Sequence, residues 1–334
     1  MKVPQSTAGP LTIEVDGELA LVAAFTDLDG TANDETLPEA DRLGSVGPAK
    51  DGFRELQSRY GIVCGPITGR SAGEAQLYAR HLGIDGPVIC EDGAVVLLPA
   101  GTDENEGHGF EVITSGDMRA VILSDVDCNA IGRFLVAVGR EIDRAAEGAP
   151  ALISTFSSPD LLQRHLGHAD IAAATLSARR LASAYVVRPT AIQLATLKRR
   201  AAAWGMRTFS DEVPHIVGAD VNKGLALRAV CRNAHAFFDV PARVRRVIPI
   251  VFGNAENDIP MFQHANDLGG IGVMVGRPQR SPGFWVDEKA IPPFVLKTSE
   301  PFGHGISSAI PRALRILSNR YGTGDDFLAA SNQC

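Results

Sequence analysis

Residues 19–31 read LALVAAFTDLDGT, and the fold can be worked out from this stretch. Its first eight residues form an unbroken apolar run, which is typical of a strand buried on both faces of a sheet. Two acids follow at once, Asp27 and Asp29, and Gly30 allows the chain to turn sharply away. Ligands of open α/β sheets bind at the carboxyl ends of the strands, so this position favours a functional role. The structural alternative is an acidic turn that caps a helix.

Apolar runs and helical patterns alternate on either side of this stretch. Strands are predicted at residues 62–67, 87–90, 94–98, 247–252 and 271–275, and helices at residues 48–60, 72–82, 223–233, 259–265 and 314–321. This alternation predicts an α/β fold built on a parallel sheet.

The pattern changes in the middle of the chain. A short strand at residues 120–124 is followed by two alanine-rich helical stretches, residues 129–146 and 169–183. We therefore expect an inserted α/β domain over residues 109–217, with residues 1–108 and 218–334 forming the core.

Composition excludes several classes of protein. The 334 residues are 45% hydrophobic and 21% charged, which is a globular composition. The net charge is −7 and no basic stripe is present, so no nucleic-acid partner is expected. No apolar run reaches the roughly 18 residues of a membrane span, and no secretory signal is recognisable. The five cysteines form no CxxC pair, so we expect reduced thiols in a cytoplasmic protein.

A second polar turn ends the strand predicted at residues 62–67. The hydroxyl of Thr68, the amide of Gly69 and the guanidinium of Arg70 could together cradle a phosphate. A simple helix cap made by Ser71 or Thr68 would explain the same residues.

Two more polar positions open helices near the C-terminal half of the core. Lys223 begins the helix predicted at residues 223–233, and GNAEND at residues 253–258 follows an apolar strand. Taken alone, the first reads as a surface lysine and the second as an ordinary acidic helix start.

Together the four turns resemble, in order, the four motifs of haloacid dehalogenase superfamily phosphatases. DLDGT at residues 27–31 is similar to the first motif, Thr68 to the second, Lys223 to the third and residues 253–258 to the fourth. The resemblance implies a Rossmann-like core with an inserted α/β cap. It also implies a Mg²⁺-dependent enzyme in which Asp27 is the nucleophile and Asp29 the general acid and base.

The resemblance assigns further roles to individual residues. The implied metal ligands are Asp27, Asp29, Asn254 and Asp258. The implied phosphate contacts are Thr68, Gly69, Lys223 and Asn257, and the implied substrate contacts are Arg70, Glu91, Asp92, Arg180 and Arg188. The family usually has an aspartate where this chain has Asn254, and a neutral amide should hold the ion more weakly.

The place of the insert, between the second and third motifs, is similar to that in Cof-type sugar phosphatases and mannosyl-3-phosphoglycerate phosphatases. EDGA at residues 91–94 resembles the ENGA segment of this subclass. This implies a small-molecule substrate, a phosphorylated sugar or sugar-acid. Arg180 and Arg188 would suit a second anionic group, or they are solvated residues near a helix end. The alternatives are a phosphotransferase of the phosphomannomutase kind and a non-catalytic sugar-phosphate-binding protein.

The histidines do not suggest a site. His165, His168, His215 and His304 lack metal-ligand spacing, and each is interpreted as a surface or satisfied core residue. No GxSxG elbow and no Walker loop occur in the chain.

Overall fold

The computed structural model describes residues 10–99, 111–115, 118–145, 151–154, 157, 181–187, 189–209, 214–276 and 291–322. Its centre is a six-stranded sheet. Five strands are parallel and lie in the spatial order β3 (Val63–Pro66), β2 (Glu18–Thr26), β11 (Val244–Gly253), β12 (Ile271–Gly276) and β13 (Leu296–Pro301). The sixth, β1 (Thr12–Val15), pairs antiparallel with the beginning of β2. The prediction of an α/β fold with a parallel sheet is therefore confirmed.

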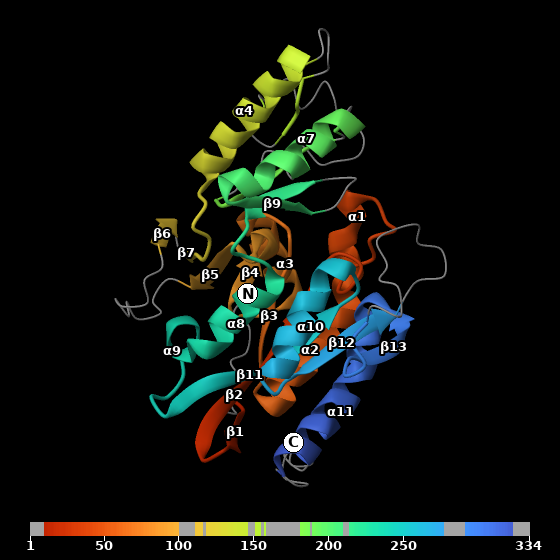
Figure 1. The fold of residues 1–334 in the computed structure, drawn as a ribbon. Coiled ribbons are helices and arrows are strands. Elements are labelled where there is room, and N and C mark those ends of the chain that lie inside the picture. Colours follow the sequence, from red (N-terminus) through yellow and green to blue (C-terminus); the bar gives the residue numbers. More distant parts are fainter. Residues whose placement is uncertain are drawn as a thin grey trace.

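Helices cover both faces of this sheet (Figure 1). One face packs against α2 (Gly47–Tyr60), α3 (Ala72–Leu82) and α11 (Phe302–Tyr321), and the other against α8 (Lys223–Arg232), α9 (Ala234–Phe237) and α10 (Ile259–Asp267). Alternate residues of β2 explain this arrangement. Ala20, Val22 and Ala24 belong to the first core, whereas Leu21, Ala23 and Phe25 belong to the second. The apolar run thus serves two cores because the strand has period two.

The order of the strands reverses between β2 and β11. From β2 the chain passes through α2 to β3 on one side, and from β11 it passes through α10 to β12 on the other. The carboxyl ends of β2 and β11 therefore flank a topological switch point, which is where open α/β sheets bind ligands.

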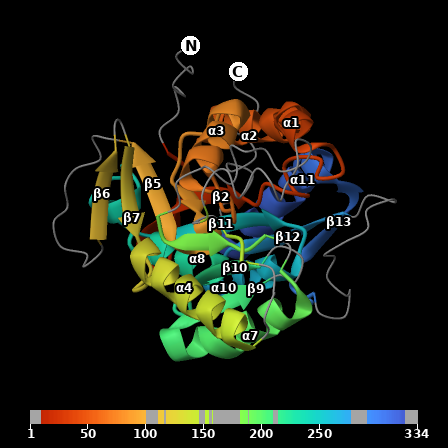
Figure 2. The same ribbon diagram turned by 90° about the horizontal axis from the view of Figure 1, so that it is seen from above.

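Two antiparallel sheets complete the fold. The first has four strands in the order β4 (Val88–Cys90), β5 (Val95–Pro99), β7 (Met118–Ile122) and β6 (Glu111–Ser115). The second has three strands in the order β8 (Ser183–Tyr185), β10 (His215–Gly218) and β9 (Met206–Phe209). One face of the three-stranded sheet packs against α4 (Cys128–Ala145) and α7 (Ala191–Ala201), as Figures 1 and 2 show.

Several predicted boundaries differ from the observed ones. The predicted helix at residues 72–82 coincides with α3. Ser183, the last residue of the helix predicted at residues 169–183, instead begins β8. Residues 169–180 lie outside the described residues. β7 pairs with β5, which precedes the expected insert, and β6 pairs with β7. The division of the chain at residues 109 and 217 stays a prediction.

Within the described residues, no helix is long and apolar enough to cross a membrane. The described cysteines, Cys64, Cys90, Cys128 and Cys231, form no disulfide bond with one another.

Candidate active site

The turn after β2 is joined to the turn after β11. The backbone N–H of Asp27 donates to the carbonyl of Phe252 at 2.9 Å, and the Thr31 hydroxyl donates to Oδ1 of Asn254 at 2.8 Å. Gly30 has a φ of +74°, and a Cβ at this position would collide with the Asn254 amide. Glycine is therefore required here both by the backbone conformation and by the close approach of Asn254.

A buried lysine connects two carboxylates across the switch point. Nζ of Lys223 lies 2.8 Å from Oδ1 of Asp27 and donates to Oδ1 of Asp258 at 2.7 Å. Lys223 reaches both because it is the first residue of α8, where the chain arrives beside the ends of β2 and β11. The other oxygen of Asp258 accepts the backbone N–H groups of Asn254 and Ala255, at 2.9 and 3.1 Å.

This network has one cation for two buried carboxylates. Burial raises the pKa of Asp27 above its usual range, and the nearby Lys223 ammonium only partly opposes the effect. Burial alone would lower the pKa of Lys223, but the charges of Asp258 and Asp27 outweigh it and hold that pKa above its ordinary value. A second cation beside Asp27 would balance the excess negative charge.

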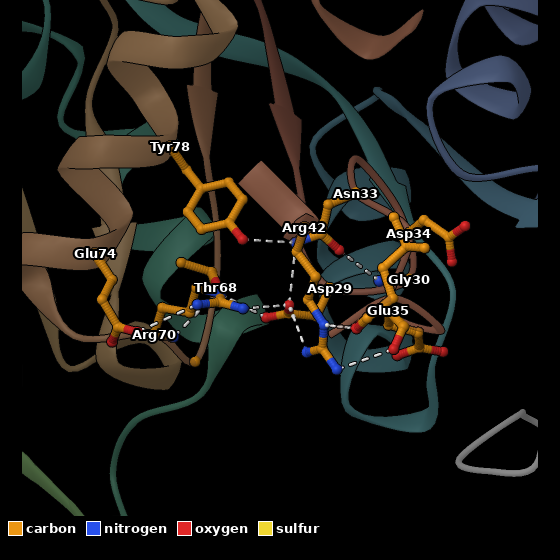
Figure 3. Close-up of polar contacts among 12 residues, drawn as sticks. Asp29, Gly30, Asn33, Asp34, Glu35, Arg42, Thr68, Arg70, Glu74 and Tyr78 are labelled. Atoms are coloured by element: carbon orange, nitrogen blue, oxygen red, sulfur yellow. Dashed lines mark hydrogen bonds and ion pairs between the residues drawn. The ribbon is translucent and has the colours of Figure 1, made fainter. Parts of the chain in front are cut away.

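Asp29, two residues further on, is bound in a different way (Figure 3). Its carboxylate accepts two hydrogen bonds from the Arg70 guanidinium, Nε at 2.8 Å and Nη2 at 2.6 Å. Asn33 donates to the same carboxylate at 3.1 Å, and Nη1 of Arg42 lies 3.6 Å away. Burial raises the pKa of Asp29, but Arg70 together with Asn33 and Arg42 outweighs it and holds the pKa below its usual value.

Arg70 is itself fixed from the side opposite Asp29. Its Nη1 donates to Glu74 at 3.2 Å, and its guanidinium lies 4.6 Å from the centre of the Tyr78 ring. Glu74 also accepts from the backbone and hydroxyl of Ser71, forming the capping box of α3. Glu74 and Tyr78 are not among the site residues predicted from the sequence. The S-x-x-E spacing at residues 71–74 was the signal that could have identified the first of them.

The turn after β3 carries Thr68 and Gly69 beside this arginine. Thr68 is buried, its hydroxyl accepts the N–H of Arg70 at 3.2 Å, and its carbonyl accepts the N–H of Asp92 at 3.0 Å. The carbonyl of Gly69 accepts a hydrogen bond from Tyr185 at 2.7 Å. The segment predicted to bind a phosphate, Thr68 to Arg70, therefore lies between the end of β3 and the three-stranded sheet, which contains Tyr185.

Glu91 and Asp92 are buried acids with positive φ angles of 52° and 58°. The Glu91 carboxylate accepts the backbone N–H groups of Leu181 and Ala182 and the hydroxyl of Ser183, at 2.9 to 3.1 Å. This differs from the predicted substrate contact, because Glu91 anchors the beginning of β8 instead. The Asp92 carboxylate accepts a hydrogen bond from Nδ1 of His215 at 2.7 Å.

The structure brings together only part of the predicted site. Asp27, Asn254, Lys223, Thr68 and Gly69 lie at the ends of neighbouring parallel strands or at the helix start beside them. Asp29 and Asp258 were predicted metal ligands, but their carboxylates are engaged by Arg70 and Lys223. The Asn257 side chain is exposed, as is that of His304. Arg180 and Arg188 lie outside the described residues.

The donors near Asp27 suit a hydrated magnesium ion. Among the described residues, no cluster of three or more His, Cys, Asp or Glu side chains could hold a metal. Mg²⁺, however, is commonly held by only one or two carboxylates and keeps several waters. The Asp27 carboxylate and the Asn254 amide oxygen provide such a minimal set, next to a buried excess of negative charge.

No protein-family model matches the chain, and no curated protein matches its sequence. Solved structures do match. A haloacid dehalogenase-like hydrolase from B. subtilis is 17% identical with a TM-score of 0.53, over 88% of this chain and 100% of that one.

Two further structures are similar over most of their length. A protein from Thermoplasma acidophilum is 16% identical with a TM-score of 0.54, over 88% of this chain and 98% of that one. The C-terminal domain of C. albicans trehalose-6-phosphate phosphatase is 12% identical with a TM-score of 0.52, over 90% and 92%. At these identities the likeness concerns the fold. The chain therefore has the α/β fold of the haloacid dehalogenase-like hydrolases.

Proposed function

We propose that the protein is a phosphatase that hydrolyses the phosphate monoester of a sugar or sugar-acid through an aspartyl-phosphate. The observation that carries this proposal is the buried contact of Lys223 with Asp27 and Asp258 at the carboxyl ends of β2 and β11. Backbone N–H groups bind the Asp258 carboxylate, whereas within the described residues none binds that of Asp27, so the lysine between them is the group that orients Asp27. The hydrolase fold and the buried hydroxyl of Thr68, which follows the neighbouring strand β3, support the same chemistry.

The first step transfers the phosphoryl group to the protein. An oxygen of Asp27 forms a bond to phosphorus, the bond from phosphorus to the ester oxygen breaks, and Asp29 gives a proton to the departing alkoxide. In the second step water attacks phosphorus, Asp29 takes a proton from that water, and Asp27 is released as a carboxylate. Lys223 and the Thr68–Gly69 turn would offset negative charge on the transferred oxygens.

Asp27 and Asn254 are the residues that would hold Mg²⁺. When bound, the ion would add positive charge beside the phosphoryl oxygens and reduce their repulsion of the Asp27 carboxylate. Because Asn254 is a neutral ligand, we expect weak binding that strengthens in the presence of a phosphorylated substrate.

The ionisation of Asp29 distinguishes its two tasks. Arg70 holds Asp29 as a carboxylate, which is the form needed to take a proton from water. For the first step the same carboxyl must carry a proton, so its hold by Arg70 has to loosen when the substrate binds.

A panel of sugar phosphates incubated with Mg²⁺ tests the proposal. Both free phosphate and isomerised sugar phosphate are measured, and Asp27→Asn purified in parallel controls for contaminating phosphatases. Phosphate release that disappears in Asp27→Asn supports hydrolysis. Isomer without phosphate would indicate a phosphotransferase of the mutase kind, and binding without either product would indicate a non-catalytic protein.

A further inference from the structure

His215 is the first residue of β10, the central strand of the three-stranded sheet. In β8, β10 and β9 it is directly opposite Tyr185 on one side and Phe209 on the other. The rings of Tyr185 and His215 are 4.0 Å apart between centroids, and those of Phe209 and His215 are 6.1 Å apart. The opposite face carries Ile216 and Ala184 into the core under α4 and α7. His215 therefore belongs to the face that does not pack against these helices.

The turn after β4 fixes the orientation of this imidazole. Nδ1 of His215 lies 2.7 Å from Oδ2 of Asp92, whose side chain is 3% exposed. A carboxylate accepts hydrogen bonds, so the proton of this contact lies on Nδ1. Nε2 is then the ring nitrogen that remains to interact with a ligand. Within the described residues it has no hydrogen-bond partner.

The ring also lies against the proposed phosphate cradle. A Cβ built on Gly69 would be 3.1 Å from Cε1 of His215 and 2.8 Å from Oδ1 of Asp92. Cε1 lies between Nδ1 and Nε2, so the edge of the ring that carries both nitrogens faces the Gly69 turn. Thr68, which precedes Gly69 in the chain, is one of the residues proposed to contact the phosphate.

We infer that His215, positioned by Asp92, contacts the leaving-group alcohol of the substrate. This inference rests on the proposed function and adds a residue that reads the part of the substrate beyond the phosphate. Nε2 can accept a hydrogen bond from a hydroxyl when the ring is neutral, and it donates to an oxygen when the ring is charged. The side chain is 22% exposed, enough for one edge to meet a ligand. The recognised class is a polyhydroxy alcohol, as in a sugar phosphate.

Asp92, Tyr185 and Phe209 are positioning residues in this arrangement. Asp92 sets the ring nitrogen that carries the proton, Tyr185 holds the Gly69 carbonyl, and the two aromatic rings limit rotation of the imidazole. Gly69 provides the space for the ring, because any side chain at this position would displace His215 or Asp92.

Two substitutions of His215 separate ligand contact from structure. In His215→Asn the amide occupies the place of Nδ1, so Asp92 keeps a partner while the Nε2 contact is removed; in His215→Gln the amide reaches the place of Nε2. Each variant is assayed with the best sugar phosphate of the panel and with p-nitrophenyl phosphate, which has no hydroxyl for His215 to contact. We expect kcat/KM of His215→Asn to fall about tenfold for the sugar phosphate and less than about twofold for p-nitrophenyl phosphate. His215→Gln should regain part of the loss.

Ser183→Ala is the matched control. Ser183 lies on the same face of the three-stranded sheet as His215, and its hydroxyl donates to Glu91. Removing this hydroxyl weakens the contact between β8 and the turn after β4 but leaves the side chain of His215 unchanged. Its ratio of sugar-phosphate to p-nitrophenyl-phosphate activity should remain that of the wild type. Equal losses on both substrates in His215→Asn and His215→Gln would overturn the inference and leave the phosphatase proposal intact. A wild-type protein that hydrolyses p-nitrophenyl phosphate but no sugar phosphate would also overturn it, whereas one that hydrolyses neither refutes the proposed function itself.

Discussion

Asp27 and Asp29 are separated by one residue, yet the structure gives them opposite surroundings. Asp27 is buried and shares a single ammonium with Asp258, and its pKa is raised by burial. Asp29 has 34% of its side chain exposed and is held by a bidentate guanidinium, and its pKa is lowered. One tight turn thus produces two carboxylates with different chemistry. Such a divergence is typical of paired acids that perform separate steps of one reaction.

Removing each carboxylate in turn tests whether Asp27 and Asp29 have different roles in the reaction. Asp27→Asn removes the nucleophile, so turnover should fall by about 10⁴-fold or more. Asp29→Asn keeps the nucleophile and should lose about 10²-fold to 10³-fold. With p-nitrophenyl phosphate, whose leaving group needs no proton, Asp29→Asn should release a burst of one p-nitrophenolate per active site before the slow steady state. Rapid-mixing absorbance measures the burst, and a burst in Asp27→Asn would contradict the assignment.

Lys223→Met tests the balance of charge around Asp27. It leaves Asp27 and Asp258 buried without a cation, which should lower the free energy of unfolding by about 4 kcal/mol. Urea unfolding followed by circular dichroism measures the loss. The double variant Lys223→Met/Asp258→Asn has one carboxylate fewer and should recover part of it. A single variant as stable as the wild type would show that the network is not a charged one.

Arg70→Met tests the contribution of ionised Asp29 to stability, because Arg70 lowers the pKa of Asp29. A folded-state pKa below the unfolded value means that ionised Asp29 stabilises the fold above about pH 4, and that this contribution is lost as the pH falls through the folded pKa. The variant should be less stable by about 2 kcal/mol at pH 7 and pH 5, with a smaller difference near pH 3.5. Urea unfolding at the three pH values checks this. Arg54→Met, which removes an exposed pair with Asp51, should change stability by less than about 0.5 kcal/mol.

Asn254→Asp tests whether Asp27 and residue 254 together bind Mg²⁺. A second carboxylate beside Asp27 should tighten Mg²⁺ binding about tenfold, measured by titration calorimetry without substrate. The hydrogen bond from Thr31 can persist, since a carboxylate oxygen also accepts it. Asn129→Asp adds the same charge on α4 and should leave Mg²⁺ affinity unchanged. Unaltered affinity in Asn254→Asp would place the ion elsewhere.

The strands and helices of the core were predictable because their signals are local. The apolar run of β2 and the helical spacing of α3 each lie within a dozen residues, and burial on both faces follows from them. The acids at the end of β2 were found for the same reason. Local signals do not predict pairing between distant segments. Ser183 is the last residue of the helix predicted at residues 169–183, but it begins β8, which pairs with β10.

The partners of the site residues were not predictable from spacing. Arg70 and Asp29 are 41 residues apart, and His215 and Asp92 are 123 apart. Which side chain meets which is set by the register of β8, β9 and β10 and by the path of the turn after β4. His215 was therefore interpreted as an ordinary histidine, although its cross-strand position puts it beside Gly69.

The adjacent residues Glu91 and Asp92 also determine how the three-stranded sheet can move. A body attached at one point can swivel in every direction, but a body attached at two points keeps a single rotational degree of freedom, about the line that joins them. Glu91 fastens β8 and Asp92 fastens β10, so the two attachments belong to neighbouring strands of one sheet. Tyr185 of β8 adds a third attachment through its hydrogen bond to the Gly69 carbonyl, so the sheet cannot turn freely while all three contacts persist. Because His215 is one of the attached residues, its ring stays beside Gly69 as long as its hydrogen bond to Asp92 is intact.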